Sequence, residues 1–561
     1  MDPAFDFEGI PDCDAPSLRR GQNELVLQYN NFSIAERVPT TPSDSAHDQS
    51  SKHGSELADK QQGPKTVWEL VFHYSLWKPG KDKRKGKLRG RFEWGLNIDV
   101  PHLTTIKTTP GATAAIFNIG LCILPWIWMG FCTTVIEIRA GILTTAQVEW
   151  WTEFYEKVLA EYFFVNNIDF RGLINIQVVS KGSECSADSV ADSGGNPKSP
   201  ECDSPGYNFT AAAPPSILLP LGGGKDSLVA YEVLRDLWPQ LPSHSAWFFL
   251  SGHPGEYQQC WRYAEMAKLS GQPCVIVGEI ECDRTGALER LMERWLQPAG
   301  HPWAALIGFV SVLVSLAHGF QYIAVGNERS ANFGNAMHLG SEVNHQFDKG
   351  FAFELAAHKY IKEHIARGVH YFSPLQHLWE VQIAQRFCEQ PKYLPVFISC
   401  NQPEGACHVA PCQSQQHTSA PQLKDEIIES GHGDKCRLED SRQCGRCEKC
   451  VFVYTLLSAH APAAVKEAFN DECLFEVEEL LPIFKALCGL AQKPMECVGT
   501  PEEMRLSLLL AREQRRRIGQ TYLPPVFEML HDSIDSAQEL LWMFDDVGPN
   551  SLIPGSWKNS D

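Results

Sequence analysis

SILLPLGGGKDSLVAYEVLRDLW, residues 216–238, fixes the class of architecture of this 561-residue chain. Its first six residues are mostly apolar and predict a short buried strand. The triplet Gly222–Gly224 predicts a tight turn, because glycine adopts backbone conformations that other residues avoid. From Ser227 to Trp238 the apolar residues recur at helical spacing. A strand that turns directly into an amphipathic helix is typical of a layered α/β fold.

The same pattern continues along the chain. AWFFL (246–250), CVIVGEI (274–280) and YIAVG (322–326) predict further strands, and residues 303–318 predict a helix. Alternating strands and helices predict a doubly wound parallel sheet, whose ligands bind at the carboxyl ends of the strands. We therefore expect functional residues after Leu221, Leu250 and Val325.

The chain length predicts two to four domains. Three polar segments, 38–65, 181–216 and 401–443, are rich in Ser, Pro, Gly and Asp and have little to bury. The expected organisation is a largely disordered segment over 1–64, an α+β domain over 65–180, a disordered insertion over 181–213, a nucleotide-binding domain over 214–400, an insertion over 401–443, a helical region with a cysteine cluster over 444–525, and a tail over 526–561.

The charge balance argues against a nucleic-acid-binding protein. The chain has 49 Lys and Arg against 68 Asp and Glu, a net charge of −19 that repels polyphosphate. Most of the 19 cysteines stand alone in apolar runs, which favours a reducing compartment over a disulfide scaffold. The acidic start MDPAFDFEGIPDCD differs from both signal and transit peptides. We expect a cytoplasmic protein.

Residues 108–136 carry no charge and are long enough to cross a bilayer, with a basic cluster upstream between residues 78 and 91. The other interpretation is a buried helix followed by a strand, TTVIEIRAG. Asn118, Gly120 and Pro125 interrupt the apolar run and favour this second interpretation. No membrane partner is expected.

The loop Gly222-Gly223-Gly224-Lys225-Asp226-Ser227 has the composition of an anion-binding cradle at a helix N-terminus. It resembles the pyrophosphate loop S-G-G-x-D-S of the ATP-pyrophosphatase (PP-loop) superfamily, with Gly222 in place of the first serine. This resemblance implies ATP and Mg²⁺, with Asp226 holding the metal; the alternative is a capping turn with Asp226 as a helix cap. The ATP-binding residues expected after the three strands are Gly222, Gly223, Gly224, Lys225, Asp226, Ser227, Ser251, Asn327 and Glu328.

Cys444-x-x-Cys447-x-x-Cys450 predicts a structural zinc site, because three thiolates at this spacing converge from one turn. The fourth ligand is either Cys400, just after a predicted strand, or Cys436 in the insertion, and we favour Cys400. The alternative is a set of reduced cysteines without metal.

Polar residues gather after the strand at 322–325, in the segments 326–332 and 341–346 and at Lys349. Their position at the expected ligand-binding edge predicts a substrate site, although a solvated loop has a similar composition. His345, Glu342 and Lys349 are candidate bases, since histidine titrates near neutrality and burial tunes Glu and Lys.

Taken together, LLPLGGGKDSLVAYEVLR, YIAVGNERSAN, SEVNHQFDKGFAFE, VFISCN and CGRCEKCVFVY resemble, in this order, the UDP-N-acetylmuramoyl-L-alanyl-L-glutamate epimerases of the MurL type. The resemblance covers about residues 65–180 and 214–460. It implies an adenine nucleotide alpha hydrolase-like (PP-loop) fold. It also implies ATP-dependent inversion of the terminal glutamate of a nucleotide-sugar dipeptide in peptidoglycan synthesis, with release of AMP and pyrophosphate.

The chemistry follows independently of the family. Removing a proton beside a carboxylate is difficult, and adenylation neutralises that carboxylate so that a positioned base can act. Two alternatives stay open: a zinc-bearing enzyme similar to 7-cyano-7-deazaguanine synthase, and a non-catalytic, membrane-attached nucleotide sensor.

Overall fold

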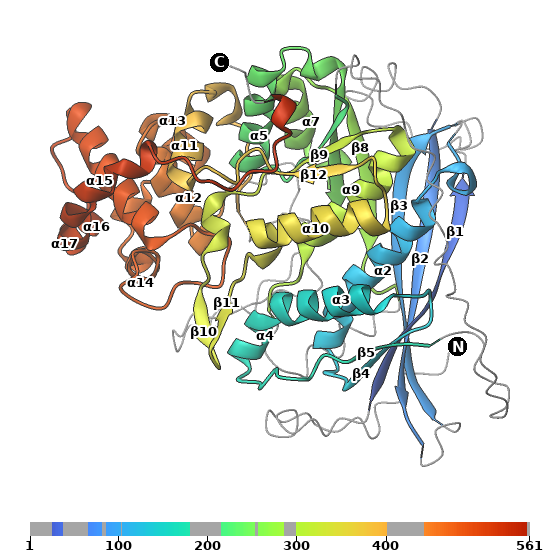
Figure 1. Cartoon of the computed structure of the whole chain (residues 1–561). Coiled ribbons are helices and arrows are strands. Elements are labelled where there is room, and N and C mark those ends of the chain that lie inside the picture. Colours follow the sequence, from blue (N-terminus) through green and yellow to red (C-terminus); the bar gives the residue numbers. More distant parts are fainter. Residues whose placement is uncertain are drawn as a thin grey trace, which may run out of the picture.

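The computed structural model contains a ten-stranded sheet with a helical lobe beside it (Figure 1). The structure describes residues 25–37, 65–80, 86–102, 104–179, 215–252, 256–284, 299–400 and 443–557. The strands lie in the order β12-β9-β6-β7-β8-β3-β2-β1-β4-β5, and a separate hairpin pairs β10 (Ala336–His338) with β11 (Ser341–Val343).

One half of the sheet is parallel. It comprises β6 (Ile217–Pro220), β7 (Ser245–Ser251), β8 (Val275–Glu281), β9 (Tyr322–Ala324) and β12 (His370–Phe372). Within this half, β6, β7 and β8 lie side by side in chain order. The chain then returns and places β9 on the other side of β6, with β12 beyond it. The strand order therefore reverses between β6 and β9, which is where doubly wound sheets bind ligands.

Helices cover both faces of the parallel half. On one face α5 (Lys225–Leu237) and α7 (Trp261–Ser270) pack in the same core as Leu219 and Trp247. On the other, α9 (Trp303–His318) and α10 (Phe351–His364) share a core with Leu218 and Phe248. Because successive strand residues face opposite sides, each strand contributes to both cores. The strands and helices predicted between residues 216 and 326 are present.

The other half of the sheet corrects two predictions. β1 (Val26–Arg37), β2 (Lys65–Lys78) and β3 (Lys87–Pro101) form a long antiparallel ribbon, and β4 (Val135–Ile138) and β5 (Ile176–Val178) extend it in parallel beyond β1. The segment 1–64 was predicted to be largely disordered, yet it supplies β1. The domain predicted over 65–180 is not separate either, because β3 pairs antiparallel with β8 and makes one mixed sheet.

Helix α2 (Ala112–Met129) lies inside the core. It is the one helix among the described residues with the length and apolarity of a membrane span, and 89% of that stretch is buried. Tyr74 and Tyr155 donate hydrogen bonds to the carbonyls of Gly120 and Leu121, at 2.8 and 2.7 Å. β4 follows, as the buried-helix interpretation predicted. Two helices, α3 (Thr145–Val158) and α4 (Ala160–Val165), complete this part.

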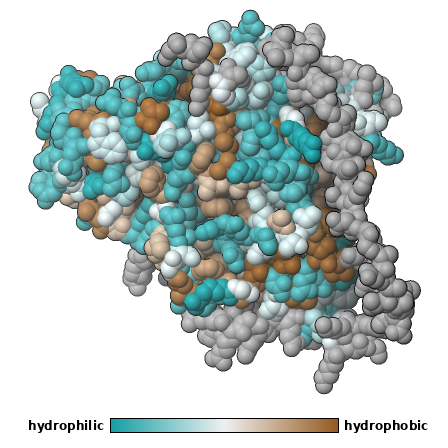
Figure 2. All heavy atoms as spheres, in the orientation of Figure 1, coloured by the Kyte–Doolittle hydropathy of each residue, from teal (hydrophilic) through white to brown (hydrophobic). Residues whose placement is uncertain are grey.

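The C-terminal part is helical. Its elements are α11 (Glu380–Cys388), α12 (Glu448–Ser458), α13 (Pro462–Ala468), α14 (Leu481–Leu487), α15 (Pro501–Arg517), α16 (Pro525–Met529) and α17 (His531–Asp535). They form a lobe beside the sheet, whose visible surface is mostly hydrophilic with scattered apolar patches (Figures 1 and 2). A short helix, α6 (Glu256–Gln259), lies between β7 and α7.

The predicted tail over 526–561 is instead part of the fold, as far as residue 557. After α17 the chain continues as a 3₁₀ helix, Ser536–Phe544, and returns to the edge of the sheet. There the Trp557 ring packs on Tyr322 of β9 and Phe372 of β12, with ring centroids 4.6 and 5.7 Å apart. The C-terminal segment thus covers the outer strands of the parallel half.

Tyr360 provides a test of how the two halves are held together. Its hydroxyl donates to Asn118 of α2 at 2.7 Å and accepts from Trp151 of α3 at 2.9 Å. Tyr360→Phe leaves both buried partners unsatisfied, so we expect a loss of about 1–3 kcal/mol in the free energy of unfolding. Thermal and urea unfolding measure it, with Tyr522→Phe at an exposed position as the control. Equal stability of the two variants would contradict this role.

Candidate functional site

The glycine loop lies at the point where the strand order reverses. It leaves β6 at Leu221, and α5 begins at Lys225 with Gly224 as its N-cap. Gly223 has a φ of 80°, and a Cβ there would lie 2.9 Å from Cε1 of Tyr263. Its carbonyl accepts a hydrogen bond from the Ile398 amide at 2.8 Å. Only glycine fits this position, and the loop leads into the positive end of the α5 dipole at the carboxyl edge of the sheet.

The chain after β9 packs directly on this loop. A Cβ on Gly326 would lie 2.9 Å from both the Asp226 carbonyl carbon and the Ser227 nitrogen. The two backbones therefore approach more closely than any side chain allows. This contact brings Asn327 and Glu328, the residues that follow Gly326, next to the start of α5.

Lys225 is fully buried, and its ammonium pairs with the carboxylates of Asp226 and Glu380. Burial alone would lower the pKa of Lys225, but these carboxylates raise it above its ordinary value. Burial would likewise raise the pKa of Asp226, whereas Lys225, Lys449 and Lys349 hold it below its ordinary value. Both groups are therefore charged at neutral pH, and Asp226 is an ionised carboxylate beside the loop.

Further acids are buried next to this pair. Burial and the negative charges of Glu380 and Asp226 raise the pKa of Glu328 to about 8. Burial and Glu380 raise the pKa of Glu503, on α15, to about 7. The site therefore carries more carboxyl groups than its lysines neutralise, and an added cation would favour their ionised forms.

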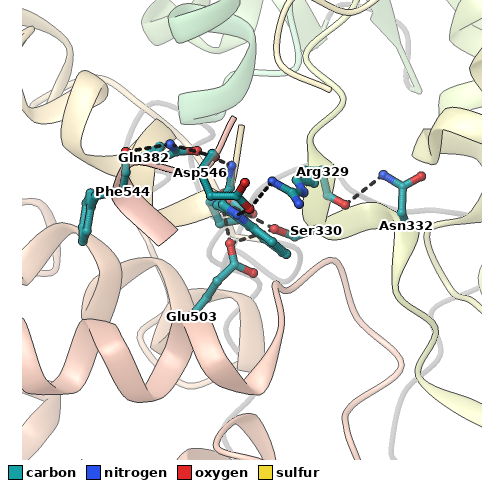
Figure 3. Close-up of polar contacts among 9 residues, drawn as sticks. Arg329, Ser330, Asn332, Gln382, Glu503, Phe544 and Asp546 are labelled. Atoms are coloured by element: carbon teal, nitrogen blue, oxygen red, sulfur yellow. Dashed lines mark hydrogen bonds and ion pairs between the residues drawn. The ribbon is translucent and has the colours of Figure 1, made fainter. Parts of the chain in front are cut away.

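Figure 3 shows how the segment after β9 is connected to the C-terminal lobe. Glu503 accepts hydrogen bonds from the Ser330 hydroxyl at 2.7 Å and from the Glu380 backbone amide at 2.6 Å. Arg329 donates to Asp546 at 2.8 Å and stacks over the Trp379 ring at 4.1 Å. The segment after β9 is thus held by residues from α11, α15 and the C-terminal segment.

A second group of titratable residues lies close by. The Lys349 ammonium donates to the Cys497 sulfur at 3.1 Å, and His345 Nδ1 lies 2.6 Å from Glu161 Oε2. His345 also interacts electrostatically with Cys497. Glu161 Oε2 accepts a further bond from the Gly300 amide at 3.2 Å. The structure therefore brings predicted residues His345 and Lys349 together with two that the sequence analysis missed.

The charges in this group shift the pKa values of His345 and Cys497. Burial would lower the pKa of His345, but Glu161 and Cys497 raise it well above its ordinary value. Burial would raise the pKa of Cys497, but Lys349 and His345 hold it well below its ordinary value. At neutral pH the group therefore contains a thiolate, an imidazolium and an ammonium. His345 carries a proton in this state, and its role as a candidate base stays a prediction.

Glu342 lies apart from this group. It is exposed on the β10–β11 hairpin, and its carboxylate accepts a hydrogen bond from the Gly334 amide at 2.8 Å. It lines a pocket of about 350 Å³ whose walls include Trp150, Phe154 and Asn344. Its role as a candidate base stays a prediction.

The remaining predicted residues lie at the same sheet edge with local partners. The Ser227 hydroxyl donates to the Gly224 carbonyl at 3.2 Å, and Ser251, at the end of β7, donates to Glu256 at 3.0 Å. The Asn327 carbonyl accepts from Ser373 at 2.6 Å. Gly222 is exposed, with open space around its Cα.

Four cysteines converge behind the loop. The sulfur atoms of Cys400, Cys444, Cys447 and Cys450 lie within 4.8 Å of one another, with Cys400–Cys447 at 3.9 Å and Cys444–Cys450 at 3.8 Å. Four sulfurs around a tetrahedral zinc, with bonds of about 2.3 Å, are about 3.8 Å apart, so the cluster fits that metal. Cys436, the alternative ligand, lies outside the described residues.

The cluster is connected to the loop through three consecutive residues. The Ile398 amide donates a hydrogen bond to the Gly223 carbonyl, and a Cβ on Gly224 would lie 3.4 Å from the Ser399 hydroxyl oxygen. Cys400, the next residue, belongs to the sulfur cluster. Gln443 holds this segment from the other side, accepting from the Ser399 amide at 3.2 Å and donating to the Phe397 carbonyl at 3.1 Å. A zinc here would brace the glycine loop without touching substrate.

We expect about one zinc per chain, because the four thiolates form a closed tetrahedral site. Cys400→Ser removes one ligand and should lower both the zinc content and the thermal stability. Elemental analysis and thermal unfolding measure these, with Cys388→Ser, outside the cluster, as the control. Full zinc retention in Cys400→Ser together with loss in Cys436→Ser would overturn the choice of fourth ligand.

Comparison with known proteins identifies relatives of this chain. The family model described as the MurL N-terminal domain matches residues 128–374, and that described as the MurL C-terminal domain matches residues 433–540. The first match crosses the boundary predicted between two domains, in agreement with the continuous sheet.

Three curated relatives are each named UDP-N-acetyl-alpha-D-muramoyl-L-alanyl-L-glutamate epimerase. The protein from Xanthomonas oryzae pv. oryzae is 29% identical over 53% of this chain and 58% of its own length. The protein from Salinispora tropica is 28% identical over 60% of this chain and 62% of its own length. That from a Micromonospora species is 27% identical, over 72% and 76%. The alignments thus span less than two thirds of the first two relatives.

Proposed function

We propose that this chain, which belongs to the MurL family, inverts the terminal L-glutamate of UDP-N-acetylmuramoyl-L-alanyl-L-glutamate to the D form, using ATP and releasing AMP and pyrophosphate. The observation that carries the proposal is a glycine loop at a helix N-terminus together with a group of partly buried residues able to exchange protons. The loop is Gly222–Gly224, and the residues are Lys349, His345 and Cys497.

The need for ATP follows from the acidity of the reacting carbon. An α-hydrogen beside a carboxylate resists removal, because the new negative charge forms next to an existing one. Transfer of AMP to the carboxylate removes that charge and makes the carbonyl a better electron acceptor. Hydrolysis of the activated acyl group at the end drives the reaction beyond the near-even ratio of an uncoupled epimerisation.

The glycine loop and the N-terminus of α5 are suited to hold the phosphates of ATP. Backbone amides and the helix dipole favour an anion there. Asp226 is ionised and only partly buried, so it fits the single carboxylate by which Mg²⁺ is commonly held when phosphates supply other ligands. The bound metal would neutralise phosphate charge. Lys225 is occupied by Asp226 and Glu380, so its role is to hold Asp226 in place.

The pocket lined by Trp150, Phe154, Asn344 and Glu342 is suited to the parts of the substrate that do not react. It lies against residues 347–353, which include the 3₁₀ turn carrying Lys349. Aromatic walls with a few amides bind nucleotide and sugar groups by stacking and hydrogen bonding. A long substrate bound there would have one end near Lys349 and His345.

The reaction itself is the first test. With UDP-N-acetylmuramoyl-L-Ala-L-Glu, ATP and Mg²⁺, we expect the D-Glu epimer, AMP and pyrophosphate. In heavy water, deuterium should appear on the glutamate α-carbon, because inversion through a carbanion-like species loses the original proton. Chiral analysis and mass spectrometry of the product measure both. Release of ADP, or pyrophosphate release without deuterium at the α-carbon, would contradict the proposal.

The phosphate loop is tested by Asp226→Asn. This change keeps the side-chain shape and removes the charge proposed to hold Mg²⁺, so AMP formation should fall by at least about 100-fold. Asp236→Asn, on the exposed end of the same helix, is the matched control and should leave turnover unchanged. If Asp226→Asn keeps most of its turnover at saturating ATP and Mg²⁺, the loop does not bind the nucleotide in this way.

A further inference from the structure

We propose that Cys497 is the acyl acceptor in this reaction, taking the activated glutamyl group from the adenylate as a thioester on which the α-carbon is inverted. The inference rests on the proposed function and adds a covalent intermediate to it. It is drawn from the contacts of Cys497, Lys349, His345 and Glu161.

The geometry is that of a nucleophilic thiol with its partners. Lys349 Nζ lies 3.1 Å from the Cys497 sulfur, and the charge of His345 acts on the same thiol. Nδ1 of His345 is held by Glu161 at 2.6 Å. A nucleophile, a histidine and a carboxylate that orients the histidine form the arrangement by which proteins activate a thiol for acyl transfer.

Two residues of this group, Glu161 and His345, come from separate parts of the chain and are themselves fixed. Glu161 lies on α4 and is also bonded to the Gly300 amide, and the His345 amide donates to Asn335 at 3.0 Å. Glu161 and His345 are therefore held in place by other parts of the protein. The Cys497 side chain is partly buried.

The charges favour a nucleophile over a base. Burial opposes ionisation of Cys497, yet Lys349, His345 and Lys449 keep its pKa well below the ordinary value. A thiolate with a low pKa is abundant at neutral pH but is a weak base, poorly suited to take a proton from carbon. It is well suited to attack an acyl group whose leaving group is AMP.

Cys497 also lies close enough to the phosphate loop for the two to share cations. The charges of Lys349 and Lys449 lower the pKa of both Asp226 and Cys497. The Lys349 ammonium contacts the sulfur directly, so this one lysine interacts with both the thiolate and Asp226.

The proposed steps balance. The thiolate forms a carbon–sulfur bond as the bond from the acyl carbon to the AMP phosphate oxygen breaks, and AMP leaves as the dianion without needing a proton. The thioester then loses its α-proton to a base and regains one on the opposite face, with no net change. Water adds to the acyl carbon, the carbon–sulfur bond breaks, and the products are a carboxylate, the thiolate and two protons released to solvent.

The intermediate is tested first in the wild-type enzyme during turnover. Acid quenching and intact-mass measurement should detect a fraction of chains carrying the glutamyl substrate. Peptide mapping should place that mass on Cys497, and neutral hydroxylamine should remove it, as expected for a thioester. Wild-type enzyme that forms AMP and the D epimer without any adduct, under conditions that trap early turnover, would overturn the proposal.

The variant Cys497→Ala separates activation from acyl transfer. Isotope exchange between pyrophosphate and ATP requires only adenylate formation, so it should persist and report a folded site. Epimer formation and AMP release should both fall by at least about 100-fold. Cys274→Ala, on a half-buried cysteine at the start of β8, should behave as wild type.

The outcomes distinguish the two proposals. Normal AMP release by Cys497→Ala, with or without epimer, would show that the adenylate is hydrolysed directly and would overturn the acyl-acceptor role alone. If wild-type enzyme forms neither AMP nor epimer from the nucleotide-sugar dipeptide, the proposed function itself fails.

Discussion

The buried ion pair between Lys225 and Glu380 is the interaction on which the site depends. Lys225 is the first residue of α5, directly after the glycine loop, and Glu380 is the first residue of α11. Both are removed from solvent, so losing Lys225 would leave the Glu380 charge uncompensated, at a cost of about 3–5 kcal/mol. Through the Glu380 amide the same contact reaches Glu503 on α15. One pair thus joins the phosphate loop, the end of the parallel sheet and the C-terminal lobe.

The parallel half could be predicted from sequence because each of its strands is short, apolar and followed by a helix or a turn. β1 could not, since only its first residues are buried; from Asn31 onward it is mostly exposed and reads as a polar segment. The continuity of the sheet was also beyond sequence reasoning. It rests on β3 pairing with β8, between residues about 180 positions apart, and no local pattern reports such a contact.

The same distinction applies to the site. The loop and the three clustered cysteines were predictable because a motif marks each of them, whereas Cys400 was chosen because it follows a predicted strand, and residues 395–399 do not form that strand. Cys497 was not predictable, because it stands alone in KPMECVGT. Only its neighbours in the fold, Lys349 and His345, distinguish it from an ordinary cysteine. His345 was found by position, but its charge state depends on Glu161, 184 residues earlier in the chain. The sequence can identify a titratable residue as a candidate for the site. Its protonation state is set by neighbours that only the fold brings close.

The location of these residues explains why the two regions matched by family models occur in one chain. Glu161, His345 and Lys349 lie within residues 128–374, and Cys497 lies within residues 433–540. The first region supplies the loop, two cations and the carboxylate that orients the imidazole. The second supplies the thiolate, three of the four clustered cysteines, and Glu503. Because neither region holds both the glycine loop and Cys497, the proposed transfer of an acyl group to sulfur would require the two regions to be folded against each other.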